Sequence, residues 1–466
     1  MRKKLCFLFV SMAYVFQIQA QLEPHAGKWR TWFITPGKAY HLPQPPSNKE
    51  EVSQVISQQQ SLDSAGWQQM LYWSAGAPGY RWQNMMTGLW TVDTSNYGAL
   101  ANMLLGVAIY DATIAAWDNK YTYKRKRPYE TDSRIKVYVP KPESPSYPCE
   151  YSVAAGVAVT IISHFYPRLT DSVTRMAQQV MQSRIAGGVA FPADTRAGFE
   201  LGKKIAEQEI EYTKDFAVKT PWDRKMPEGP GVWRGKNPMQ PLAGKNKTVV
   251  LDSASQFRPG PPPDFAKDMA ELKTFKQNFR SMSNALFYAS NAFWDEVLNK
   301  KIFEYNLAQN PPRAARLYAI VAIGYYDGFS ACWDAKYTYW GIRPNQYDTT
   351  FKSLVPAPPF PGYPSGHAAL SGVMAELCSY FFPAEKNWFR QKAKDAAESR
   401  FQAGIHFRTD NEVALELGKK VAAAIIEKVK TDGADNPPTF SKHEKPVNKT
   451  NPQKTHEPQF AKEKSN

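Results

Sequence analysis

Along most of this chain, apolar residues recur at three- and four-residue spacing, which is the pattern of an α-helix with one buried face. The windows that show it fall into two sets: 99–117, 152–166, 169–185 and 195–215, then 314–333, 367–382, 385–403 and 411–430. Few segments alternate apolar and polar residues in the way a half-buried strand does. The pattern therefore predicts an all-α protein made of two groups of helices.

The segments around these helices have a different composition. Residues 22–48 are proline-rich and are expected to lie on the body as an irregular arm, and residues 222–264, rich in Pro and Gly, predict a long crossover loop. From residue 432 onward the chain has few apolar residues, so we expect disorder there. The predicted division is a signal segment (1–20), an N-terminal bundle (21–221), the crossover loop (222–264), a C-terminal bundle (265–431) and a tail (432–466).

The two sets of helices carry a repeat. The repeated residues, each followed by its copy 216 positions later, are Lys120 and Lys336, Arg127 and Arg343, Pro148 and Pro364, and Arg184 and Arg400. The run Glu-Leu-Gly-Lys-Lys also occurs twice at this offset, at 200–204 and 416–420. A constant offset over so many positions indicates an internal duplication. We therefore expect two similar bundles packed about a pseudo-twofold axis.

The N-terminus has the three parts of a secretory signal peptide. Residues 2–4 are basic, residues 5–16 are mainly apolar, and Ile-Gln-Ala ends at Ala20, where we expect cleavage. The mature protein should then be exported, either to a periplasm or out of the cell. The apolar stretch is too short to span a bilayer, and we find no later segment long and uncharged enough to do so, so we expect no stable membrane anchor.

Charge and cysteine content narrow the choice of partners. The chain has 58 Lys and Arg against 43 Asp and Glu, a net charge of +15. It shows no basic stripe or nucleic-acid-binding motif, so the charge suits steering of anionic small molecules better than nucleic-acid binding. After cleavage three cysteines remain, Cys149, Cys332 and Cys378, without the spacing of a disulfide framework or metal site. The sequence leaves the oligomeric state open.

Three short segments of the second set concentrate residues that suit an oxyanion. They are 336–344 with Lys336 and Arg343, 364–367 with the run Pro-Ser-Gly-His, and 399–410 with Arg400, His406 and Asp410. Arg and Lys make strong charge-assisted hydrogen bonds to phosphate-like ligands. Ser365 adds a hydroxyl, and Gly366 lets the backbone approach closely. The inventory therefore fits a tetrahedral or trigonal-bipyramidal oxyanion such as phosphate or vanadate.

The order and spacing of these residues resemble the signature of the type 2 phosphatidic acid phosphatase (PAP2) and vanadium haloperoxidase superfamily: Lys-x6-Arg-Pro, Pro-Ser-Gly-His and Ser-Arg-x5-His-x3-Asp. The resemblance extends from about residue 96 to about residue 430. It implies an all-helical fold with the site inside a bundle. It also implies that vanadate is held by Lys336, Arg343, Ser365, Gly366 and Arg400.

The resemblance also implies roles for the remaining residues. His406 would be the vanadium ligand, or the nucleophile that carries a phosphohistidine in a phosphatase. Asp410, one helical turn later, would orient the His406 ring, although a backbone carbonyl is an alternative, and His367 suits a general acid–base. Trp333 and Phe360 match aromatic positions on the halide side of chloro- and iodoperoxidase pockets.

Three functions remain open at this point. One is a haloperoxidase that oxidises halide with hydrogen peroxide to hypohalous acid. The second is a PAP2-type acid phosphatase acting on phosphate esters, and the third is a noncatalytic oxyanion-binding or structural protein. The aromatic positions and the duplicated single chain favour the haloperoxidase, which is our prediction.

The first copy has lost both histidines. Ala190 and Tyr151 stand where His406 and His367 stand in the second copy, and Glu150 stands at the position of Gly366. The cations Lys120, Arg127 and Arg184 remain, and converging buried cations without an anion are very costly. We therefore predict a structural role for this bundle, with the Glu150 carboxylate inside the former anion pocket, paired with at least two of the three cations.

Overall fold

The structure, a computed structural model, describes residues 22–92, 97–289 and 292–434. Over these ranges the chain forms α-helices, short 3-10 helices and one isolated bridge between Val232 and Gly341, with no β-strand. The α-helices are α1 (Asn48–Gln60), α2 (Ser64–Ser74), α3 (Tyr80–Val92), α4 (Gly98–Tyr123), α5 (Pro128–Thr131), α6 (Glu150–Phe165), α7 (Thr170–Ala186), α8 (Pro192–Thr213), α9 (Ala266–Thr274), α10 (Phe279–Phe287), α11 (Phe293–Glu304), α12 (Pro311–Tyr339), α13 (Pro344–Tyr347), α14 (Gly366–Phe381), α15 (Lys386–Gln402) and α16 (Arg408–Val429). The all-α prediction is confirmed.

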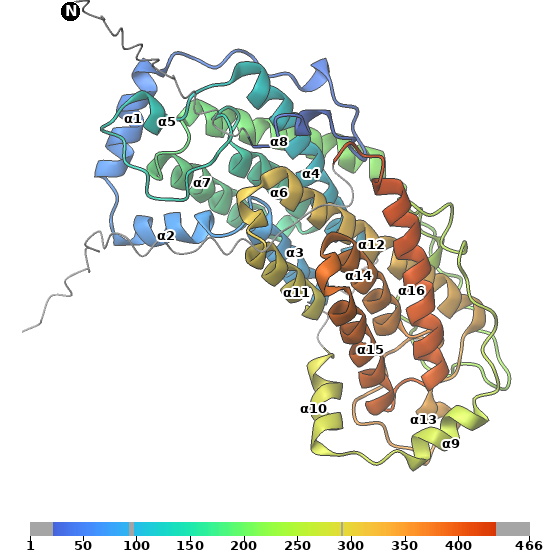
Figure 1. Cartoon of the computed structure of the whole chain (residues 1–466). Helices are drawn as coiled ribbons and strands as arrows, with labels where there is room; N and C mark the ends of the chain where they lie inside the picture. Colours follow the sequence, from blue (N-terminus) through green and yellow to red (C-terminus); the bar gives the residue numbers. More distant parts are fainter. Residues whose placement is uncertain (1–21, 93–96, 290–291, 435–466) are drawn as a thin grey trace, which may run out of the picture.

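The helices form two groups along the long dimension of the molecule (Figure 1). In the first half, α4, α6, α7 and α8 pack together, and in the second half α12, α14, α15 and α16 do the same. The two long helices α4 and α12 pack against each other between the groups. The core is therefore continuous from one bundle to the other, and one large cluster of buried apolar side chains includes residues of both.

The helix bounds repeat with the offset found in the sequence. The helices α5, α6, α7 and α8 begin and end 216 residues before α13, α14, α15 and α16, and α4 ends 216 residues before α12. Both halves also contain a cis peptide bond at the matching places, Tyr147–Pro148 and Tyr363–Pro364. These bounds are consistent with an internal duplication.

The segments that precede the two bundles repeat as well, which the sequence reading did not find. The carboxylate of Asp111 accepts the backbone N–H groups of Trp32, Phe33 and Ile34, and Asp327 accepts those of residues 249–251. A short 3-10 helix of sequence Ala-Gly-Lys lies in each segment, at 26–28 and 243–245. Each buried aspartate thus fastens an irregular segment to its bundle, so the expected arm does lie on the body.

Close helix packing in each bundle depends on glycine. A Cβ atom on Gly418 of α16 would lie 2.1 Å from the carbonyl oxygen of Ala369 in α14, and one on Gly202 of α8 would lie 2.1 Å from that of Val153 in α6. Such contacts are far inside van der Waals distance, so only glycine lets these helix pairs come so close. This approach brings the N-terminal end of α14 beside that of α16, where the motif residues gather.

Three expectations from the sequence need correction. The helices α1–α3 and α9–α11 were not predicted: α1 is mostly polar, and α2 and α10 are short. Their caps are nevertheless readable, because Asp63 and Asn278 accept N–H bonds from Gly66 and Ser281. The folded body also reaches Ala434 rather than ending at 431, and Asp432 is buried and pairs with Arg316.

The third correction concerns membrane spans. The segment Gly98–Thr131, which contains α4, is long and apolar enough to cross a bilayer. Its apolar stretch is completely buried inside the protein. A helix that is apolar all round therefore forms the centre of a helical core here. The expected signal segment at 1–20 and the tail beyond 434 lie outside the described residues.

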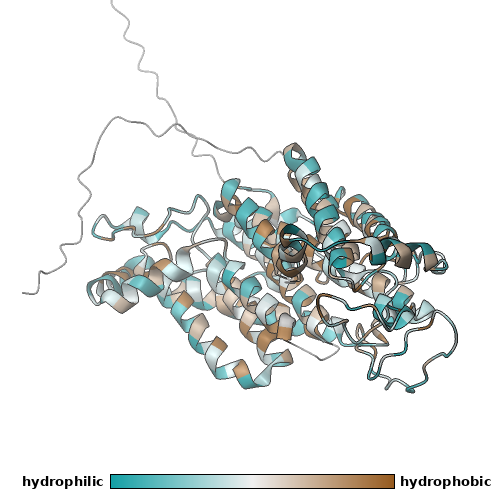
Figure 2. Cartoon of the chain, turned by 90° about the horizontal axis from the view of Figure 1, so that it is seen from below, coloured by the Kyte–Doolittle hydropathy of each residue, from teal (hydrophilic) through white to brown (hydrophobic). Residues whose placement is uncertain are grey.

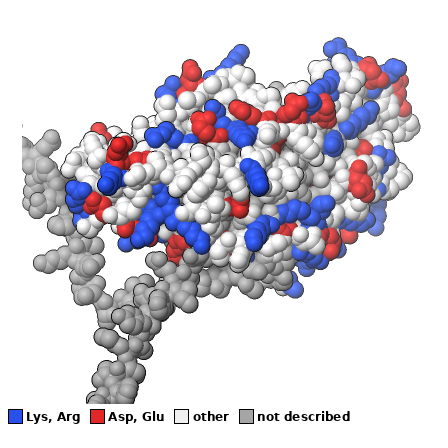
Figure 3. Space-filling model, turned by 90° about the horizontal axis from the view of Figure 1, so that it is seen from above, with Lys and Arg blue, Asp and Glu red and all other residues white. Residues whose placement is uncertain are grey.

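The surface has a mixed character. Seen from below, hydrophilic residues lie on many outward helix faces and hydrophobic residues lie mainly between helices (Figure 2). Seen from above, Lys and Arg are interspersed with Asp and Glu, and no continuous basic stripe crosses this face (Figure 3).

Candidate active site

The end of α12 and the turn after it supply two cations. Trp340, with φ 52°, ends α12 in the left-handed conformation, and the chain then turns back so that Arg343 caps α13. The Lys336 Nζ donates to the carbonyls of Pro361 and Gly362, at 2.8 and 3.0 Å. Arg343 donates from Nε to Phe360 O and from Nη1 to Ile405 O. Both side chains are completely buried, and backbone carbonyls fix their direction.

The N-terminal end of α14 supplies neutral donors. Ser365 caps the helix and is fully buried, yet its hydroxyl has no hydrogen-bond partner. A Cβ atom at Gly366 would lie 3.3 Å from the Trp333 ring and 3.9 Å from Lys336 Cε, so side-chain volume here would intrude on the space between them. Helix N-termini present free N–H groups and a partial positive charge, which favour an anion.

His406 is held in a defined orientation. Its Nδ1 lies 3.0 Å from Asp410 Oδ2, and its Nε2 lies 3.2 Å from Arg343 Nη1. Asp410 also accepts the N–H of Phe407, which fixes the carboxylate at the start of α16. We assign the ring proton to Nδ1, because a carboxylate faces that atom and a guanidinium faces Nε2. The Nε2 lone pair then faces Arg343 Nη1 at the cavity wall, and the expected pairing of His406 with Asp410 is confirmed.

His367 and Arg400 complete the predicted group. Arg400 on α15 is buried and donates to Ala285 O on α10 and to Ser399 Oγ. The Nε2 of His367 has no partner, although this atom is buried. Burial, with the charge of Arg400, lowers the pKa of His367 to about 3. The ring is therefore neutral while no anion offsets the cations.

The electrostatics indicate a missing negative charge. Burial lowers the pKa of Lys336 to about 7, and burial lowers the pKa of Arg343 and of Arg400 to about 10. Burial raises the pKa of Asp410, the carboxyl beside them, to about 7. Buried cations without counter-charge are costly. A bound oxyanion would supply this charge.

Both imidazoles open onto a cavity of about 280 Å³. Trp333 and Phe360, which the sequence singled out, line it, and their ring centroids lie 5.2 Å apart. Sequence reasoning missed other aromatic residues of its wall, namely Trp90, Tyr288, Phe293, Trp294, Tyr325 and Phe329. These residues belong to no motif, and Trp90 comes from α3 in the other half of the chain, so only the fold brings them together.

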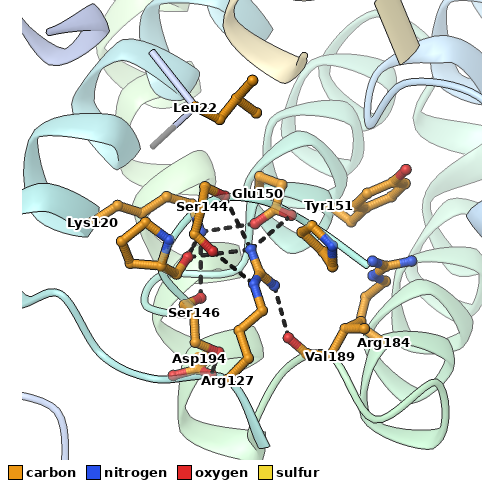
Figure 4. Close-up of polar contacts among 12 residues, drawn as sticks. Leu22, Lys120, Arg127, Ser144, Ser146, Glu150, Tyr151, Arg184, Val189 and Asp194 are labelled. Atoms are coloured by element: carbon orange, nitrogen blue, oxygen red, sulfur yellow. Dashed lines mark hydrogen bonds and ion pairs between the residues drawn. The ribbon is translucent and has the colours of Figure 1, made fainter. Parts of the chain in front are cut away.

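The matching pocket of the first bundle shows how these cations hold an anion (Figure 4). Glu150 Oε2 lies 2.8 Å from Lys120 Nζ, and Glu150 Oε1 lies 3.4 Å from Arg127 Nη2. Burial by itself raises the pKa of Glu150, but the charges of Lys120, Arg127 and Arg184 outweigh it and hold the pKa at about 2. The predicted pairing of Glu150 with at least two cations is confirmed.

Comparison of the two pockets locates the place for a ligand. Arg127 and Arg343 direct Nε and Nη1 to equivalent carbonyls, at positions 144 and 189 and at 360 and 405. The Nη2 of Arg127 reaches Glu150, whereas the Nη2 of Arg343 has no partner among the described residues. The unpartnered Nη2 of Arg343 and hydroxyl of Ser365 are the donors that an oxyanion such as vanadate requires, so the residues present fit that group.

Three comparisons with known proteins bear on this site. A family model described as the VCPO second helical-bundle domain matches residues 383–432. The structure of the first bacterial vanadium-dependent iodoperoxidase aligns with a TM-score of 0.55 and 21% identity, over 85% of this chain and 100% of the other. The holo-type bacterial vanadium-dependent chloroperoxidase aligns with a TM-score of 0.55 and 14% identity, over 72% and 91%. No curated protein matches by sequence.

Proposed function

Because the chain has the fold of the vanadium haloperoxidase and PAP2-like superfamily, we propose that it is an exported, vanadate-dependent haloperoxidase-like enzyme. It would oxidise a halide with hydrogen peroxide, taking up one proton and releasing hypohalous acid and water. The observation that carries the proposal is the unpartnered Arg343 Nη2 beside the His406 Nε2, in a cavity with an aromatic wall. The C-terminal bundle would carry this chemistry and the N-terminal bundle would be structural.

The residues divide into those that hold the cofactor and those that act around it. Lys336, Arg343 and Arg400 would neutralise vanadate, while Ser365 and the Gly366 amide would donate hydrogen bonds to it. His406 would be its protein ligand through Nε2. Burial and the neighbouring cations lower the pKa of His406 and keep the ring neutral, and the bond to Asp410 orients it. When bound, vanadate supplies a Lewis acid that activates hydrogen peroxide for reaction with halide.

His367 would manage the proton that the reaction consumes. Its Nε2 is unpartnered and its ring lines the cavity, so a proton can pass between the ring and an oxygen atom there. Lys336 would polarise the oxygen atom that exchanges this proton, through its buried ammonium group.

The aromatic wall would govern access of halide and water. Trp333 lies between Phe329 and Phe360, with centroid distances of 4.0 and 5.2 Å. This apolar surface strengthens electrostatic interactions in the site, because it excludes water from one side. Two structural neighbours, an iodoperoxidase and a chloroperoxidase, support halide as the substrate class.

A paired assay tests the proposal. Metal-free protein should gain peroxide-dependent oxidation of iodide or bromide when orthovanadate is added, and should lose it when inorganic phosphate competes for the same cations. The same preparation is tested without vanadate for hydrolysis of p-nitrophenyl phosphate. Ester hydrolysis with no vanadate-dependent oxidation would replace the haloperoxidase by a PAP2-type phosphatase. If neither activity is detected while the protein still binds vanadate, the result would favour a noncatalytic oxyanion-binding protein.

A further inference from the structure

Arg184 in the first bundle is a buried cation whose charge acts on Glu150 without a direct ion pair. It lies on α7, is 2% exposed, and forms no ion pair with a described residue. Its Nη1 donates to Ser74 Oγ at 3.0 Å, and its guanidinium lies 4.0 Å from the centre of the Tyr151 ring. Its Nε is buried and has no partner. Among the described residues, a serine hydroxyl and a ring face contact the guanidinium, and its buried Nε–H is left without an acceptor.

The other two cations of this bundle are satisfied. Lys120 pairs with Glu150 and also donates to the carbonyl of Pro145 at 2.6 Å. Arg127 donates to Val189 O and to Ser144 O, each at 2.7 Å, and reaches the second oxygen of Glu150. The carboxylate of Glu150 is thus engaged on one side of the pocket, and Arg184 lies on the other side beside Tyr151 (Figure 4).

A cavity of about 210 Å³ adjoins Arg184. Its lining includes Arg184, Tyr151 and Glu150, with Leu22 and Gln309 from outside the bundle helices. The Tyr151 hydroxyl donates to Gly76 O, so it does not contact Arg184. The cavity therefore has room for a small ligand next to a buried cation whose Nε has no partner among the described residues.

We propose that this cavity binds one small monovalent anion, either a halide ion or a short carboxylate, on Arg184. One negative charge would neutralise the guanidinium and accept from its free N–H groups. A dianionic phosphate or vanadate does not fit this position, because the Glu150 carboxylate, which lines the same cavity and pairs with Lys120 and Arg127, would repel its higher charge more strongly than that of a monovalent anion. The site differs from the one in the C-terminal bundle and does not depend on the function proposed for it.

Crystals of the wild-type chain soaked in bromide test the site directly. We expect an anomalous bromide peak beside the Arg184 guanidinium. If a short carboxylate binds at the same position, a soak that also contains formate at equal ionic strength should remove this bromide peak. Peaks in the C-terminal cavity do not count for or against the site. The proposal would be overturned if bromide bound elsewhere in the crystal while neither bromide nor formate density appeared in the Arg184 cavity.

Thermal unfolding in solution gives a second readout. Bromide and formate should raise the unfolding temperature saturably, and Arg184→Gln should weaken binding at least about tenfold, because a charge-assisted hydrogen bond contributes roughly 1.5 kcal/mol or more. Arg168→Gln, which removes an exposed arginine of the same bundle, should leave the binding curve unchanged. Arg184→Lys keeps the charge and provides a folded comparison if Arg184→Gln does not fold. Equal anion responses in wild type, the Lys variant and the Gln variant would also contradict the proposal.

Discussion

Glu150→Gln tests whether a protein carboxylate has replaced the ligand of an old anion site. The substitution keeps the shape of the side chain and removes the charge that faces Lys120 and Arg127. All three side chains are at most 2% exposed, so water cannot compensate for the loss. The pKa of Glu150 falls from 4.5 to about 2 in the folded protein, which corresponds to roughly 3 kcal/mol of stability. Breaking a buried ion pair on one side costs about 3–5 kcal/mol, in the same range.

The assay is equilibrium denaturation in urea at several pH values. The Glu150 carboxyl has a depressed pKa, so its contribution is present above about pH 4.5 and is lost as the pH falls toward about 2. The wild type should therefore be more stable than the variant by about 3 kcal/mol at pH 7, and the gap should narrow below pH 4.5. Glu200→Gln, at an exposed glutamate of the same bundle, should cost at most about 1 kcal/mol. A gap under about 1 kcal/mol at pH 7, or one that widens in acid, would refute the reasoning.

Three further predictions follow from the two bundles. His406→Ala should abolish turnover while equilibrium dialysis still detects some vanadate binding, because the three cations remain; wild-type activity would remove His406 from its assigned role. His367→Ala should bind vanadate and lower kcat about 10²- to 10⁴-fold, whereas His164→Ala, at an exposed histidine, should change neither quantity. Burial and the charge of Asp111 raise the pKa of Glu209 well above its ordinary value, so the wild type should lose stability as the pH rises above about 4.5. Glu209→Ile, which copies Ile425 of the second bundle, should reduce that loss in urea denaturation between pH 5 and pH 8, and an unchanged slope would contradict it.

Much of the site was readable in the sequence because its determinants are local or are repeated. His406 and Asp410 lie four residues apart, and Asp410 in the first turn of α16 faces both the Phe407 N–H and His406 Nδ1, so their pairing at 3.0 Å depends only on a short segment of the chain. The repeat predicts that Glu150 faces Lys120 and Arg127, because equal offsets imply equal positions in two similar bundles. The apolar periodicity likewise predicted the eight main helices, since each buries one face or, like α4, its whole surface.

The tertiary structure decided what depends on contacts between distant segments. Trp90 and Trp294 line the cavity although they belong to no motif and lie outside the predicted helices, so no local pattern could indicate their role. The same holds for the burial of the apolar stretch within Gly98–Thr131, whose composition alone is that of a membrane span. Only the fold shows that the Nη2 of Arg343 has no partner among the described residues, whereas the Nη2 of Arg127 reaches a carboxylate. The same is true of Arg184, whose buried Nε has no described hydrogen-bond partner. The type of each residue comes from the sequence, but whether a buried charge is matched depends on every segment packed around it.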